Sequence, residues 1–163
     1  MNDFKAFMVG RKEEDVVEVV ASNRMLEPEL DKNGEPVVLK KGKDGKPDEY
    51  KMTPAVWKIK AITSDLDELI RRECTKKVPI PGKRGQYTQE TDNDKYIAKM
   101  CAASIVHPNL NNAELQDFYG VKSEDALLKE MLLPGEYSEL KIKIMEVNGY
   151  DMSMDKLVDE AKN

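Results

Sequence analysis

The stretch from Cys74 to Val121 restricts the fold of this chain more than any other part of the sequence. Its first part, residues 75–90, contains two prolines and two glycines, so an irregular basic loop is predicted there. A helix with an apolar stripe follows. Pro108 is predicted to end that helix at His107, because the residue before a proline avoids the helical conformation. Asn111 is then predicted to cap a short helix that Gly120 closes.

Residues 1–63 are predicted to form a small antiparallel β-hairpin or sheet. Residues 16–22 (VVEVVAS) are rich in β-branched side chains, and residues 56–62 (VWKIKAI) alternate apolar and basic side chains with a period of two. Asn33-Gly34 and Asp44-Gly45 favour type I′ hairpin turns. The insert at about 36–54, which is rich in Pro, Gly, Lys and Asp, is expected to be mobile.

Residues 64–163 are predicted to be helical, with five or six short helices. Capping residues are expected at Ser64, at Asp92 or Asn93, and at Ser123, each followed by a regular apolar stripe. The length of 163 residues suits one domain. The predicted fold is therefore a single α+β domain over 1–163 that is mostly α.

The charge of the chain is unevenly distributed. Its net charge is −5, yet residues 71–87 carry six basic residues against Glu73 alone, and residues 111–163 carry twelve acidic and six basic residues. Such polarity favours self-association or a charged protein partner. The overall acidity makes nucleic acid an unlikely partner, because dedicated nucleic-acid binders are usually basic.

Catalytic and metal-binding motifs are not apparent in the sequence. His107 is the only histidine, and its place before Pro108 predicts a structural role at a helix end. Cys74 and Cys101 are predicted to be buried free thiols without zinc-ligand spacing. Gly82-Lys83 fails the phosphate-loop pattern because Arg84 follows it. We expect no enzyme activity, no cofactor and no metal.

The sequence predicts a cytoplasmic protein. Its first seventeen residues lack the apolar run of a signal peptide, and no apolar stretch of 18 residues is present that could span a membrane.

Two segments are candidates for protein binding. The basic segment is open to three interpretations, a solvated surface loop, a protein-docking loop and, as the least favoured, a contact with nucleic acid. The methionine-rich tail is open to packing in the core or to binding a partner. The candidate residues are Arg71, Arg72, Lys76, Lys77, Lys83, Arg84, Tyr87, Met152, Met154, Leu157 and Val158.

Three blocks, CTKKVPIPGKRGQY, HPNLNNAELQDFYGV and LLPGEYSEL, carry a resemblance to a known family. In order and spacing the chain resembles the XkdN-like tail assembly chaperones of contractile-tailed phages and of phage-like particles of Gram-positive bacteria. The resemblance implies a non-catalytic phage or prophage protein that binds the tape measure protein, and tail tube subunits as a further client, while the tail is built. It also implies a chaperone that acts in the host cytoplasm and is absent from the mature particle.

Two other functions are left open by the sequence. The first is a minor structural component of the tail or baseplate. The second is a regulatory or nucleic-acid-binding protein that acts through the basic residues between Arg71 and Arg84. The insert at 36–54 also looks longer than the resemblance would imply, so its hairpin is expected to be either extended or disordered.

Overall fold

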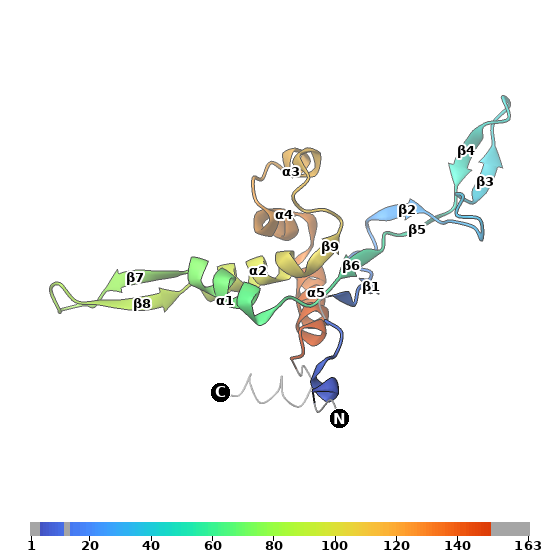
Figure 1. Ribbon diagram of the computed structural model, residues 1–163. Coiled ribbons are helices and arrows are strands. Elements are labelled where there is room, and N and C mark those ends of the chain that lie inside the picture. The colour runs from blue at the N-terminus through green and yellow to red at the C-terminus, as the bar shows by residue number, and fades with distance from the viewer. Residues whose placement is uncertain (1–3, 12–13, 151–163) are drawn as a thin grey trace.

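The molecule is an elongated arrangement of a helical body and two β-arms. The computed structural model describes residues 4–11 and 14–150. One arm, formed by residues 75–91, extends from one side of the body, and the other, formed by residues 26–54, extends from the opposite side (Figure 1). A short 3-10 helix, η1 (Lys5–Phe7), lies near the amino terminus and is exposed.

A three-stranded antiparallel sheet lies in the body. Its order is β1 (Val17–Val19), β6 (Trp57–Ile59), β9 (Ile105–His107). The side chains of Trp57 and Ile59 are buried while Lys58 between them is exposed. This confirms the period-two pattern predicted for residues 56–62, because successive side chains of a strand point to opposite faces.

Five α-helices are present in the described residues: α1 (Ser64–Glu73), α2 (Asn93–Ser104), α3 (Ala113–Tyr119), α4 (Glu124–Met131) and α5 (Pro134–Val147). The predicted caps Asp92 and Ser123 are confirmed, since each side chain accepts a hydrogen bond from the backbone N–H three residues later. The caps predicted at Ser64 and Asn111 were wrong by one residue. Thr63 and Asn112 occupy those positions instead.

The core lies where α2, α4 and α5 meet β6 (Figure 1). Its largest fully buried side chains include Trp57, Ile59, Met100, Cys101, Leu127, Leu128, Leu140 and Ile144. They come from elements far apart in the sequence. The sheet and the helices therefore share one hydrophobic core.

The arm formed by residues 26–54 consists of two antiparallel ladders. β2 (Leu26–Pro28) pairs with β5 (Met52–Pro54), and β3 (Val38–Lys41) pairs with β4 (Pro47–Tyr50) beyond it. Of the two alternatives for the 36–54 insert, the structure has the extended hairpin, and the mobility of the insert stays a prediction. The type I′ turns were wrong: Gly34 and Gly45 have positive φ, but no described non-glycine residue does. A type I′ turn needs positive φ at both of its two central residues.

The segment 75–90, predicted to be an irregular loop, is a hairpin. β7 (Thr75–Pro79) pairs with β8 (Tyr87–Thr91) over five register positions, from Thr75 opposite Thr91 to Pro79 opposite Tyr87. The turn-forming residues act only at the tip. Pro79 is tolerated because it is the last residue of an edge strand, where a missing N–H costs little. The flanking Thr and Val side chains favour an extended backbone.

Helix α2 ends at Ser104, earlier than predicted, and residues 105–107 form β9. Ile105 and Val106 are β-branched, and the residue before Pro108 is restricted to extended conformations. The His107–Pro108 peptide bond is cis. The prediction that strands are confined to the amino-terminal part, with a mostly helical remainder, was therefore wrong. β7, β8 and β9 follow Thr63, and the fold is a mixed α+β arrangement in which helices do not dominate.

Candidate protein-binding surfaces

The first candidate surface is the β7–β8 hairpin, residues 75–91, which we call the basic arm. Its base is held tightly to the body. The Thr75 and Thr91 hydroxyls lie 2.7 Å apart, the Thr75 hydroxyl donates to the Arg71 carbonyl at 2.8 Å, and Asp92 N–H donates to the Cys74 carbonyl at 2.8 Å. Because β7 follows α1 directly and β8 leads directly into α2, the direction of the arm is set by these two helices.

The tip of the basic arm is formed by two successive turns. Lys83 N–H donates to the Ile80 carbonyl and Gln86 N–H donates to the Lys83 carbonyl, both at 3.1 Å. Gly82 and Gly85 occupy the third position of each turn with φ of 76° and 77°. Only glycine adopts such angles without strain, and a proline before it is typical of a type II turn. The turns leave Lys83 and Arg84 exposed at the far end of the arm.

Five of the predicted binding residues lie together on the basic arm. Lys76 and Lys77 are on β7, Lys83 and Arg84 are at the tip, and Tyr87 begins β8 with 62% of its side chain exposed. These basic residues therefore lie on a hairpin and not on the predicted irregular loop, and their role in binding stays a prediction.

Arg71 and Arg72 lie in the last turn of α1, at the base of the arm. Arg71 is already engaged within the body: its Nη2 donates to the Tyr96 hydroxyl at 2.9 Å and its guanidinium stacks 4.3 Å from the Tyr96 ring centre. The Tyr96 hydroxyl donates to Asp67. Burial, and next this hydrogen bond, raise the pKa of Tyr96 above its usual range. Arg71 thus connects α1 to α2 and supports the arm from below.

The methionine-rich tail was also predicted to bind a partner. Met152, Met154, Leu157 and Val158 lie outside the described residues. That part of the site stays a prediction.

Sequence reasoning missed a second surface, which we call the Phe118 groove. It is an open groove of about 440 Å³ lined by Pro108, Asn109, Asn112, Glu114, Leu115 and Phe118. The Phe118 ring is 80% exposed and meets the Tyr119 ring edge-on, with their centres 5.0 Å apart. Leu115 and Tyr119 pack against the core, so Phe118 is the large apolar residue of α3 that is turned outward.

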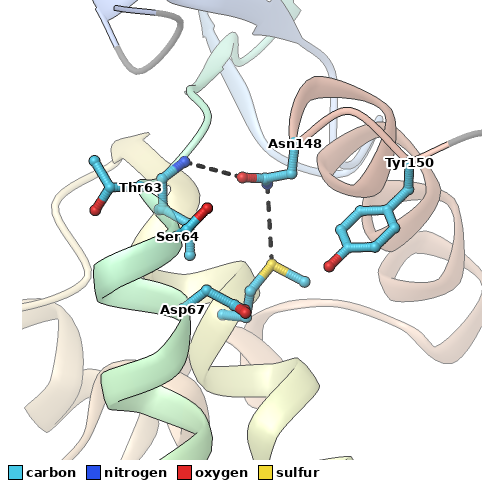
Figure 2. Close-up of a pocket in the computed structure, with 7 residues that line it drawn as sticks. Thr63, Ser64, Asp67, Asn148 and Tyr150 are labelled. Carbon is cyan, nitrogen blue, oxygen red and sulfur yellow. Dashed lines mark hydrogen bonds between the residues drawn. The ribbon is translucent and has the colours of Figure 1, made fainter.

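A third, smaller cavity of about 90 Å³ lies between the start of α1 and the end of α5 (Figure 2). Asn148 faces it and binds three separate elements. Its Oδ1 accepts from Ile62 N–H at 2.9 Å, and its Nδ2 donates to the Ser104 hydroxyl at 3.1 Å and the Ile144 carbonyl at 2.8 Å. These bonds satisfy the backbone at the end of α5 and fix the β6–α1 connection. Asn148 is best explained as a structural link.

The sequence singled out one histidine and two cysteines as candidates for chemistry. His107 is exposed in β9, opposite Lys58, so the predicted role at a helix end was wrong. Cys74 and Cys101 are confirmed as buried free thiols, and burial raises the pKa of Cys101 to about 12. Among residues 4–11 and 14–150, no group of three or more potential metal ligands comes together. None of the helices in these ranges is long and apolar enough to cross a membrane.

An exposed apolar groove such as the Phe118 groove is typical of a surface that binds another polypeptide. Comparison with known proteins agrees with the resemblance noted in the sequence. The chain belongs to the phage XkdN-like tail assembly chaperone family, whose model matches residues 48–162. That match includes the basic arm, the Phe118 groove and Asn148.

Individual relatives come from Bacillus subtilis (strain 168). The uncharacterized protein YqbN is 30% identical over 106 residues, and the phage-like element PBSX protein XkdN is 26% identical over 106 residues. Each alignment covers 64% of this chain and 70% of the relative. The crystal structure of YqbN resembles the fold with a TM-score of 0.59 at 24% identity, over 93% of this chain and 99% of that one.

Proposed function

We propose that this protein is a non-catalytic chaperone that binds the tape measure protein while a phage or prophage tail is assembled. Tail tube subunits are the second client we propose. The observation that carries the proposal is membership of the tail assembly chaperone family over residues 48–162. We place this activity in the host cytoplasm and expect the chaperone to be absent from the finished particle.

The Phe118 groove is the client-binding surface that we favour. A single aromatic ring that is 80% exposed beside Leu115 and Pro108 offers the apolar contact that a helical client segment would bury. Aromatic side chains dominate the binding energy of many protein interfaces. The groove lies within the block HPNLNNAELQDFYGV, which is part of the family resemblance.

Co-expression with the tape measure protein tests this proposal. We expect Phe118→Ala to weaken client binding by about 2 kcal/mol, or roughly thirty-fold in Kd, without changing the thermal stability of the free chaperone. Phe7→Ala is the matched control, because Phe7 is 79% exposed but lies on η1. Binding would be measured by co-purification and then by calorimetry with client fragments.

Two results would contradict the proposal. A wild-type chain that neither co-purifies with the tape measure protein nor raises its solubility would argue against the client. Equal losses of affinity in Phe118→Ala and Phe7→Ala would argue against the groove. Mass spectrometry of purified particles gives an independent check, since a chaperone should be far below the amount of a structural subunit.

A further inference from the structure

A second surface groove, which we call the acidic groove, lies between α1, α2 and the start of α4. It has a volume of about 250 Å³. Leu66 and Leu69 form part of its floor and are 37% and 47% exposed. Glu73, Glu124 and Asp125 line its rim, and Lys99 lies 3.5 Å from Glu73. The groove therefore combines an open apolar floor with a net negative rim.

The tip of the basic arm has the complementary properties. Tyr87 is an exposed aromatic side chain, and Lys83 and Arg84 lie on the adjacent turns. The arm extends away from the helices, so its tip is remote from the groove of its own chain (Figure 1). An isolated two-stranded hairpin is only marginally stable in water and gains stability when it packs against another element. A neighbouring molecule can supply such an element.

We propose that the tip of the basic arm of one copy docks into the acidic groove of a second copy. Tyr87 would cover Leu66 and Leu69, while Lys83 and Arg84 would face Glu73 and Glu124. The two surfaces are different, so the contact is head-to-tail. Each docked copy still offers a free arm or a free groove to the next, and such contacts extend into chains unless they close into a ring.

Charge reversal at each surface tests the proposal by sedimentation velocity over a range of concentrations. The mass of the wild type should rise to at least about twice the monomer mass of 18.5 kDa, and added salt should reverse the rise. K83E/R84E and E73K/E124K should each remain monomeric. In K83E/R84E the tip of the arm and the groove are both acidic, and in E73K/E124K they are both basic, so the two surfaces repel each other.

A mixture of the two variants supplies the sharpest result. The acidic arm of one variant matches the basic groove of the other, and the reverse pairing also matches, so an equal mixture should regain the wild-type mass. K40E/K41E on β3 is the matched control for the arm, since it makes the same change in net charge on the other arm and should associate as the wild type does.

Three results would overturn the proposal: a wild type that stays monomeric, variants that associate like the wild type, or a mixture that fails to associate. A monomeric chain whose arm instead binds nucleic acid or an acidic client segment would also overturn it. The test is independent of the client-binding proposal, because it contains no tape measure protein and leaves Phe118 unchanged.

Discussion

One ion pair connects the amino-terminal segment to the corner between α4 and α5. Arg24 Nη2 lies 2.6 Å from Glu136 Oε1 and also donates to the Met131 carbonyl at 3.1 Å. The same Glu136 oxygen accepts from Leu133 N–H at 2.8 Å, in the first turn of α5. The hydrogen bond from Arg24, and after it those from Ser22 and Leu133, lower the pKa of Glu136 to about 2.

This lowered pKa predicts a loss of stability in acid. A carboxylate whose pKa falls on folding stabilises the native state above its unfolded pKa, near 4.5, and the contribution disappears as pH falls toward about 2. Glu136→Gln should therefore be less stable than the wild type at pH 7, and the difference should shrink between pH 5 and pH 2. Urea denaturation at several pH values measures it.

Glu139→Gln is the control for that experiment, because Glu139 lies one turn later on α5 and is exposed. It should change the stability little at any pH. A difference between Glu136→Gln and the wild type that persists unchanged at pH 2 would show that the ion pair is not its cause.

At the scale of elements, sequence patterns succeeded where local chemistry decides the structure. Asp92 and Ser123 cap their helices because a short side-chain acceptor satisfies a free N–H, and this depends on neighbouring residues alone. The alternation around Trp57 identified β6 in the same way. The hairpin structure of the basic arm was not predicted, because the turn residues at its tip dominated the local sequence pattern. The pairing that forms the hairpin joins Thr75 to Thr91 across that tip.

The candidate binding surfaces were likewise predicted only in part. The basic residues at 76–84 were identified because charge is visible in a sequence whatever the backbone does. Phe118 was not, since α3 contains other apolar side chains and only the tertiary packing shows that Leu115 and Tyr119 face inward. The available signal was the adjacent aromatic pair Phe118-Tyr119 in a seven-residue helix, since two neighbouring positions of a short helix cannot both face the core.

The hydrogen bonds of Asn148 predict that this side chain stabilises the junction of α5 with α2 and with the β6–α1 connection. Asn148→Ala would remove the acceptor of Ile62 N–H and the donor to Ser104, leaving partly buried polar groups unpaired. We expect a loss of about 1–3 kcal/mol in the free energy of unfolding. For a chain of this length the melting temperature should fall by about 2–4 °C for each kcal/mol lost.

Asn111→Ala provides the comparison in thermal denaturation, because Asn111 is an exposed asparagine in the connection before α3. It should melt close to the wild type. If both variants melt together, Asn148 does not hold α5 to the β6–α1 connection as its hydrogen bonds indicate.

At the scale of the whole molecule, the arms and the body differ in what holds them together. The buried cluster is built by the body sheet and the helices, and none of its members comes from residues 75–91. The basic arm is stabilised mainly by its own ladder and by the bonds at its base. The arm can therefore serve as a binding element whose changes in sequence leave the body intact.

This separation predicts that the arm can be shortened without unfolding the protein. Lys76 and Glu90 are register partners, so an Asn-Gly turn that replaces residues 77–89 can join them directly. The shortened chain should melt within about 4 °C of the wild type, because it loses no member of the core. The fluorescence of Trp57, the only tryptophan, should stay that of a buried indole.

A shortened chain with a solvent-exposed Trp57 would show instead that the arm is part of the folding unit. If it remains folded and monomeric at concentrations where the wild type associates, the arm acts between molecules and not within one.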